Sequence, residues 1–375
     1  MKKLKVLQIA EIPFDNYYIN NLIDFVDKDL FDFVFINFGD ENSSYVKAIT
    51  SRGYKIYSLP PDPRRHLFRS AYKVWRICRK ERPDLVHAHL FFPSLIGLIV
   101  AKSQGLRTLL TRHYSVSIHE LQPRIKRIPY LAMQSIINRF ADHIIAPSRL
   151  VKETLMQLEF VPEDKISVVP YGQRIERFHI EDVQIVSKRH ELNMDGYFTM
   201  LVIGRLFDRK GLYFLFEALG SLVSEYPKLK LYLAGDGPHR GQFEKHVRSL
   251  GIEEHVVFLG WRHDVLDIIA ACDLIVHPSL EEALPSAVIE SLMLKKVIIA
   301  TDVGGIRDIL DNGRYGIIIQ SGNSEALKIA IKHAIDNYDS LSRIAQQGRD
   351  YLLNYMGAEK VAKQHELLYR KIIGI

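Results

Sequence analysis

Residues 273–290 read DLIVHPSLEEALPSAVIE and combine a buried strand, a polar loop and a helix start. The run Leu274–His277 predicts a parallel strand, because runs without polar alternation are typical of strands that helices cover on both faces. Pro285 and Ser286 are typical of a helix start, and the pattern from Ala287 onward is helical. The stretch therefore predicts a strand–loop–helix unit of an α/β domain.

Short runs rich in Val, Ile and Leu alternate with helical patterns along the whole chain, which predicts two α/β domains with doubly wound parallel sheets. The expected strands are Lys5–Ala10, Phe33–Asn37, Leu85–His89, Thr108–Thr111, His143–Ala146 and Ile166–Val169, then Met200–Gly204, Lys230–Gly235, Val256–Leu259, Leu274–His277, Val297–Ala300 and Gly316–Ile319. The periodicity lapses from Phe178 to Gly196. We therefore expect domains at 1–179 and 180–355, with a C-terminal helix at 356–375 that returns to the first domain.

Composition excludes several classes of protein. Of the 375 residues, 47% are hydrophobic and 25% are charged, which excludes a disordered or fibrous chain. The apolar stretch from Leu90 to Ala101 contains Pro93 and is too short to cross a bilayer. Cys78 and Cys272 lie in apolar patterns, as expected of reduced, buried thiols. We expect a cytoplasmic protein.

The formal net charge of +6 is unevenly distributed. Residues 1–180 hold 27 Lys and Arg against 18 Asp and Glu, and the remainder holds 23 against 26. Between Arg64 and Arg82, eight basic residues accompany a single acid, Glu81. This segment is either a solvated helix face or the contact surface for an anionic partner. No nucleic-acid-binding motif is recognisable, so we expect no nucleic acid partner.

Two glutamates flank the predicted helix start. Glu282 lies in the loop before it and Glu290 about a turn inside it, so the exposed helix-start amides fall between them. Such amides bind phosphate readily. The arrangement fits a nucleotide diphosphate sugar, with its sugar near Glu282 and its ribose near Glu290. The alternative interpretation is two solvated surface glutamates.

Two basic residues follow another predicted strand. Arg205 directly follows the strand Met200–Gly204, and Lys210 precedes the next helix. Across a short loop, both side chains can reach a diphosphate, Arg as a fork of donors and Lys as a point charge. Basic loop residues are common, so this pair is informative only together with the two glutamates.

These residues occur in an ordered set of motifs over residues 200–320 that resembles the retaining glycosyltransferases of family four, which have the GT-B fold of two Rossmann-like domains. The set comprises Gly204-Arg205 with Lys210-Gly211, Ala234–Pro238, Phe258–Gly260, Asp273 with His277–Ser279, Glu282 to Glu290, and Gly304-Gly305. The resemblance implies that the second domain binds a nucleotide sugar through Arg205, Lys210, Gly260, Trp261, Glu282, Leu284, Pro285, Ser286, Ala287 and Glu290. It implies no metal and no cofactor besides this donor substrate.

In the first domain the resemblance is thinner and implies acceptor binding. Pro83–His89, Thr111–His113, Ala146–Ser148 and Val169–Gly172 look like family segments, and His113 matches the active-site histidine. The first loop, Ala10–Phe14, lacks the usual glycine pair, and Tyr171 replaces the usual Asn. His87 and His89 share one face of a strand, but a third metal ligand at a useful spacing is absent from the sequence.

The resemblance implies a retaining transfer in which the departing phosphate takes the acceptor's proton. Arg205 and Lys210 would stabilise the leaving diphosphate. Glu282 would bind the sugar, and His113 would position it or stabilise the transition state. The expected acceptor is a glycan or lipid-linked glycan, and the basic first domain suggests peripheral contact with an anionic membrane. A nucleotide-sugar 2-epimerase and an inactive nucleotide-sugar-binding protein remain as alternatives.

Overall fold

The computed structural model describes residues 3–14, 16–113 and 127–375, apart from the side chain of Arg64. It divides into two compact units. Unit 1 comprises Met1–Gln173 and Met356–Ile375, and unit 2 comprises Arg174–Tyr355. The division falls six residues before the expected boundary at 179, because the short 3-10 helix Ile175–Phe178 contacts helix α12 of unit 2.

The described strands of unit 1 form one parallel sheet in the order β3-β2-β1-β4-β5-β6-β7. Strand order reverses between β1 and β4, so the loops after these two strands lie at the switch point of the sheet. The strands are β1 (Leu4–Ala10), β2 (Phe31–Phe38), β3 (Lys55–Leu59), β4 (Leu85–His89), β5 (Arg107–Thr111), β6 (His143–Ala146) and β7 (Ile166–Val168).

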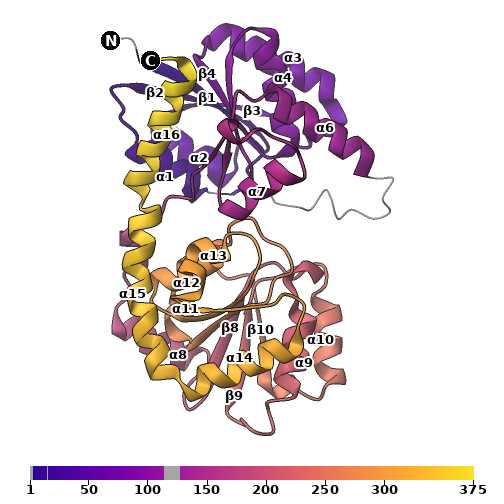
Figure 1. The fold of residues 1–375 in the computed structure, drawn as a ribbon, viewed down its shortest axis with the longest axis vertical. Helices are drawn as coiled ribbons and strands as arrows, with labels where there is room; N and C mark the ends of the chain where they lie inside the picture. The colour runs from indigo at the N-terminus through magenta and orange to yellow at the C-terminus, as the bar shows by residue number, and fades with distance from the viewer. Residues whose placement is uncertain (1–2, 15, 114–126) are drawn as a thin grey trace. The chain divides into compact units, whose positions relative to one another are not determined.

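Helices cover both faces of this sheet. Figure 1 shows α1 beside α16 and α3 beside α4, pairs that also have many contacts. The α3–α4 face buries one core cluster, which includes Leu7, Ile36, Val74 and Ile96. The described helices of unit 1 are α1 (Tyr17–Phe25), α2 (Ser44–Ser51), α3 (Leu67–Glu81), α4 (Phe91–Ser103), α6 (Arg127–Phe140), α7 (Arg149–Gln157) and α16 (Ala358–Ile373).

Unit 2 repeats the design with a parallel sheet in the order β10-β9-β8-β11-β12-β13. Its strand order reverses between β8 and β11. Ligands of open parallel sheets bind at such a reversal, outside the carboxyl ends of the strands. The strands are β8 (Phe198–Ile203), β9 (Leu229–Ala234), β10 (Val256–Gly260), β11 (Leu274–His277), β12 (Val297–Thr301) and β13 (Ile317–Ile319). Two doubly wound α/β units confirm the predicted fold class.

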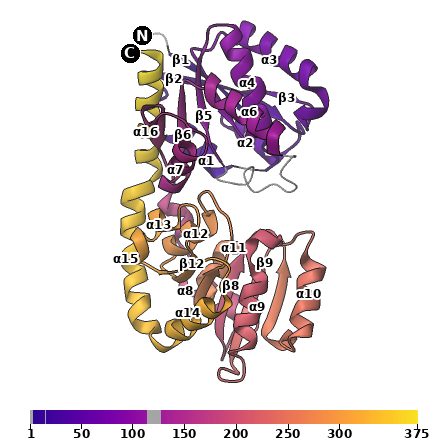
Figure 2. The ribbon, with the colours of Figure 1, turned by 45° about the vertical axis from the view of Figure 1, so that its right-hand side comes forward.

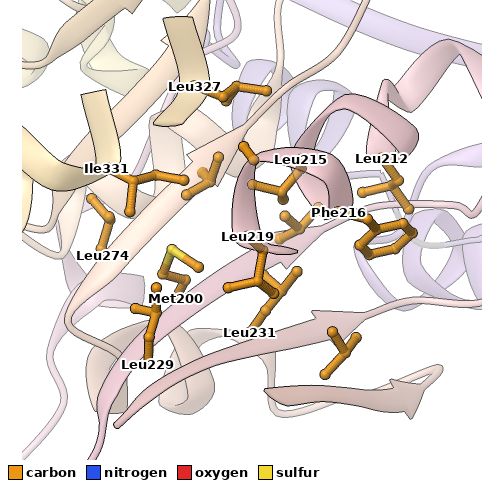
Figure 3. Close-up of a cluster of buried hydrophobic side chains, with 14 of the residues drawn as sticks. Met200, Leu212, Leu215, Phe216, Leu219, Leu229, Leu231, Leu274, Leu327 and Ile331 are labelled. Carbon is orange, nitrogen blue, oxygen red and sulfur yellow. The ribbon is translucent and has the colours of Figure 1, made fainter. Parts of the chain in front are cut away.

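Helices α14, α9 and α10 lie in that order along one face of the unit 2 sheet (Figure 2). Their apolar residues recur every three to four positions and pack in one core cluster with the strands. Figure 3 shows part of this cluster, in which Leu215 and Leu219 of α9 lie over Met200 and Leu231. The described helices are α8 (Asp182–Glu191), α9 (Leu212–Gly220), α10 (Arg240–Ser249), α11 (Val265–Ala271), α12 (Ser286–Met293), α13 (Ile306–Ile309), α14 (Ser324–Asp336) and α15 (Tyr338–Met356).

Candidate active site

The loops that follow β8 and β11 meet at the switch point of unit 2. Lys210 follows β8, and its Nζ lies 2.5 Å from Oε1 of Glu282, which follows β11. Because β8 and β11 are parallel neighbours, their carboxyl ends share one edge of the sheet. The structure therefore brings together two of the residues that the sequence singled out.

Glu282 is held by further donors. Its Oε1 also accepts from the Ser279 hydroxyl at 2.9 Å and lies 3.1 Å from His277 Nε2. Burial alone would raise the pKa of Glu282, but the hydrogen bond and charge of His277, with the charge of Lys210, lower this pKa to about 2. Glu282 is therefore an ionised, rigidly placed carboxylate at neutral pH.

Glycines allow these loops to approach closely. At Gly211, φ is +65°, and an added Cβ would lie 2.0 Å from the Pro278 carbonyl oxygen. At Gly304, φ is +56°, and a Cβ would lie 2.5 Å from the Glu282 carbonyl oxygen. Only glycine fits either position, since a side chain would be strained in its conformation and would clash with backbone. These glycines hold the loop that carries Glu282 in place.

Helix α12 begins where the sequence predicted it. Pro285 is its N-cap residue and supplies no side-chain cap, and the first intrahelical bonds run from the amides of Val288 and Ile289. Ser286 is exposed and Ala287 is half-buried, whereas the side chains of Leu284 and Pro285 are buried. Ser286 and Ala287 thus offer helix-start amides for an anion, while Leu284 and Pro285 pack the loop.

Glu290, within α12, has a partner that the sequence did not predict. Its Oε1 accepts from Arg177 at 3.3 Å. Burial raises the pKa of Glu290, and the charge of Arg177 opposes this rise. Arg177 holds this carboxylate on the face of α12 turned toward the 3-10 helix Ile175–Phe178.

Two of the residues predicted to bind the donor, Arg205 and Trp261, lie at the surface of unit 2. Arg205 is exposed, and its guanidinium lies 4.8 Å from the ring centre of Phe207. Within the described part of the chain, Arg205 forms no ion pair with a carboxylate. Trp261 is 60% exposed and follows Gly260, whose carbonyl accepts from the Gly235 amide at 2.8 Å. The neighbouring Arg262 is bound to Glu191 and Asp264 and so acts structurally.

His113 belongs to unit 1, where it joins a buried cluster of imidazole and phenol rings. Its Nε2 lies 3.1 Å from Nδ1 of His89, and its Nδ1 lies 2.9 Å from the hydroxyl of Tyr171. Burial lowers the pKa of His113 to about 4 and the pKa values of His87 and His89 well below their usual range. These three rings are therefore neutral near pH 7.

The described residues contain no group of three or more His, Cys, Asp or Glu side chains placed to hold a metal ion. His87 and His89 instead bind Thr111 and Gln8. In the same parts of the chain, none of the helices has the length and apolar character needed to span a bilayer. Cys78 and Cys272 are free and buried, as predicted.

Sequence reasoning missed Arg177 and the contact role of Tyr171. Arg177 lies inside the expected first domain, one residue before the segment Phe178 to Gly196 in which the periodicity lapses, and no motif pointed to it. Tyr171 was noted as a departure from the family pattern, but its bond to His113 depends on the pairing of separate strands. In both cases the missing information was the spatial neighbour and not the residue type.

Two family models match almost the whole chain. Residues 17–177 match the model "Glycosyltransferase Family 4", and residues 184–351 match "Glycosyl transferases group 1". The first match covers most of unit 1, and the second covers the switch-point loops and α12 of unit 2.

Relatives and solved structures agree with these matches. The GPI3 subunit of phosphatidylinositol N-acetylglucosaminyltransferase from Saccharomyces cerevisiae is 27% identical over 80% of this chain and 69% of its own length. A UDP-Gal:alpha-D-GlcNAc-diphosphoundecaprenol alpha-1,3-galactosyltransferase from Escherichia coli is 22% identical over 80% of this chain and 79% of its own. The crystal structure of Anabaena Alr3699/HepE in complex with UDP has a TM-score of 0.84 at 21% identity, over 98% of this chain and 100% of that one. This likeness shows the GT-B fold.

Proposed function

Because the chain belongs to the group 1 and family 4 glycosyltransferases, we propose that it transfers a sugar from a nucleoside diphosphate sugar to a hydroxyl acceptor with retention of configuration. The observation that carries this proposal is the ionised Glu282, fixed by Lys210, His277 and Ser279 on the loop that leads into α12. A carboxylate held in this way suits hydrogen bonding to sugar hydroxyls.

The donor's other parts fit the neighbouring groups of unit 2. The helix-start amides of Ser286 and Ala287 would hold the diphosphate, since the positive end of a helix favours anions. Glu290 would accept hydrogen bonds from the ribose hydroxyls, and Arg177 keeps the half-buried carboxylate of Glu290 in place. Trp261 and Gly260 would lie near the base. The HepE structures that contain UDP and UDP-glucose support a uridine donor.

The leaving diphosphate develops negative charge during transfer, and fixed positive groups stabilise such charge. Arg205 is available for this task, because within the described residues its guanidinium lies over the ring of Phe207 and forms no ion pair with a carboxylate. Lys210 supplies a second charge while bonded to Glu282. We propose that these groups act without a metal ion and that the departing phosphate takes the acceptor's proton. Glu282 Oε1 is engaged by three donors, which disfavours a covalent role for that oxygen.

Unit 1 would bind the acceptor, which we propose to be a lipid-linked glycan of the cell surface. The names of two relatives support a lipid acceptor, since one acts on a phosphatidylinositol and the other on a diphosphoundecaprenol-linked sugar. The basic first part of the chain suits an anionic membrane surface. A cytoplasmic enzyme at the membrane face, without nucleic acid partners, fits this proposal.

A donor screen followed by a transfer assay tests the function. UDP-, GDP- and ADP-linked sugars are tested for thermal stabilisation, since a ligand at 100 times its Kd adds about 2.7 kcal/mol. The donor that stabilises is then incubated with and without lipid-linked acceptors and with EDTA. We expect transfer only with acceptor, unchanged by EDTA. An epimer formed without acceptor would indicate an epimerase, and binding without turnover would indicate an inactive binding protein.

Glu290→Gln tests the donor site itself. A hydrogen bond to a charged group contributes about 1.5–3 kcal/mol, so the variant should bind donor about tenfold to a hundredfold more weakly. Glu225→Gln is the control, because Glu225 also pairs with a cation, Lys332, but on the surface away from the switch point. Titration calorimetry measures both. Equal donor affinity in wild type and Glu290→Gln would remove the ribose role.

A further inference from the structure

A chain of hydrogen bonds in unit 1 has its direction fixed by a backbone carbonyl. His365 Nδ1 lies 2.8 Å from the Val361 carbonyl oxygen, and a carbonyl only accepts, so Nδ1 carries the proton. Burial lowers the pKa of His365 to about 4, so its ring is neutral and Nε2 accepts. Tyr18 therefore donates its hydroxyl proton to His365 Nε2 at 2.8 Å. Its oxygen in turn accepts from Thr111 at 3.2 Å.

Each hydroxyl has one proton, so the direction continues along the chain. Thr111 donates to Tyr18 and therefore accepts from His87 Nε2 at 2.7 Å. The neutral His87 then accepts at Nδ1 from the hydroxyl of Tyr369 at 3.0 Å. The Tyr369 oxygen accepts in turn from the side-chain amide nitrogen Nε2 of Gln8 at 3.2 Å. The donor and the acceptor of every hydrogen bond in this series therefore follow from the proton on His365 Nδ1.

The series of hydrogen bonds ends at His113 and Tyr171. Gln8 Oε1 accepts from His89 Nε2 at 2.6 Å, which leaves His89 Nδ1 to accept from Nε2–H of His113 at 3.1 Å. The lone pair on His113 Nδ1 then accepts from the hydroxyl of Tyr171 at 2.9 Å. Both ring nitrogens of His113 are thus engaged, and the ring is neutral. A neutral imidazole contributes shape and dipole to a reaction but no positive charge.

We propose that Tyr171 is a positioning residue for His113 in the transfer reaction, holding its ring as the Nε2–H tautomer. The inference rests on the proposed function, in which we assign His113 the task of positioning the sugar or stabilising the transition state. A second contact between the two residues supports it, since the rings of Tyr171 and His113 have centroids 5.6 Å apart and planes 27° from parallel. His113 and Tyr171 are half-buried, whereas His87, His89 and Gln8 are fully buried. Tyr171 therefore lies at the outer end of the series of hydrogen bonds. Its hydroxyl is the group that fixes the Nδ1 side of the His113 ring.

The tautomer can be measured without substrate. In protein labelled with ¹⁵N-histidine, long-range proton–nitrogen correlations at pH 7 should show His113, His89 and His87 as neutral Nε2–H forms and His365 as Nδ1–H. A variant lacking the His113 imidazole, His113→Gln, identifies its signals. In Tyr171→Phe, the Nδ1 resonance of His113 should move to the position of an imine nitrogen without a hydrogen bond. An Nδ1–H form of His113 in the wild type would overturn the proposal.

Kinetics supply the second readout. Tyr171→Phe should lower kcat about tenfold, the size expected from one lost hydrogen bond, while KM for the donor changes less than about twofold. Tyr54→Phe is the matched control. Tyr54 is also half-buried in unit 1, and its hydroxyl donates to the carbonyl of Ile23, which takes no part in the series of hydrogen bonds described above. The control should leave kcat and the His113 signals unchanged. Equal kcat in both variants would overturn the proposal, as would full activity of His113→Gln.

The two proposals fail in different ways. If wild-type protein transfers no sugar from any donor, the proposed function is contradicted and Tyr171 has no reaction to serve. If transfer is observed but Tyr171→Phe behaves as Tyr54→Phe does, the function stands and the positioning role is excluded.

Discussion

At the scale of single residues, Glu282 shows how a half-buried carboxylate stays ionised. Its desolvation is offset by a lysine, a histidine and a hydroxyl that all reach the same oxygen. The sequence predicted Glu282 and Lys210 as site residues because each follows a strand at the same edge of the sheet. It did not predict their mutual bond, which joins residues 72 positions apart. Residue types and the order of strands were sufficient for the first inference but not for the second.

The lowered pKa of Glu282 predicts a pH dependence of stability. The pKa is about 2 in the folded protein against 4.5 as its ordinary value, so its stabilising contribution is complete above about pH 4.5 and is lost as the pH falls toward 2. Wild type should therefore exceed Glu282→Gln in free energy of unfolding by about 2 kcal/mol more at pH 6 than at pH 2.5. Urea unfolding at a series of pH values measures this difference.

Glu290 provides a control of opposite sign. Its pKa is raised by burial, so any pH-dependent stabilisation that it supplies is present at low pH and lost as the pH rises through its folded value. The difference between wild type and Glu290→Gln should therefore shift in the other direction with pH. A pH-independent difference for Glu282→Gln would contradict an ionised, hydrogen-bonded Glu282.

At the scale of elements, buried strands were easier to predict than a strand at the edge of a sheet. The bounds of β4, β6 and β11 agree with the sequence prediction, because each is a short run in which every residue is buried. Strand β3 was missed. It lies at the edge of its sheet, and its sequence Lys55–Leu59 mixes charged, polar and apolar residues that are mostly half-exposed. An edge strand lacks the burial that makes a continuous apolar run necessary.

Helix α3 carries the exposed aromatic and basic side chains on which the proposed membrane contact rests. Phe68 is 89% exposed and Tyr72 is 59% exposed, and Arg76 and Arg79 lie over the rings of Tyr72 and Trp75. Its other face, with Val74 and Ile77, packs into unit 1. Exposed aromatic and basic side chains on one helix face suit the interface of an anionic bilayer.

Vesicle co-sedimentation tests this role of α3. Each basic residue near an anionic surface contributes about 1 kcal/mol, so changing Arg69, Lys73 and Arg76 to Ser should weaken binding by about a hundredfold or more. Binding should require anionic lipid and should fall with salt. The control changes Lys228, Lys245 and Arg248 of unit 2 to Ser, which removes the same charge elsewhere. Equal recovery with neutral and anionic vesicles would exclude the membrane role.

At the scale of the whole molecule, the C-terminal segment completes unit 1. Helix α16 packs on α1, and Glu366 accepts from the amide of Asp27 at 2.7 Å. Backbone bonds join Gln173 to Met356 and Ala358. The same helix supplies His365 and Tyr369 to the buried hydrogen-bond chain. A segment that is remote in sequence therefore contributes both apolar cover and polar partners to the first sheet.

Removal of α16 should consequently destabilise unit 1 while unit 2 remains folded. In a chain that ends at Met356, His87 and Gln8 lose their bonds to Tyr369, and buried polar groups without partners cost about 1–3 kcal/mol each. The loss of apolar cover over α1 adds to this cost. Hydrogen exchange read by mass spectrometry should show lost protection in β1 and β4 and retained protection in β8 and β11. A chain that lacks only Gly374 and Ile375 is the control and should exchange as the full chain does. Unchanged protection of β1 and β4 without α16 would mean that the first sheet is stable without its C-terminal helix.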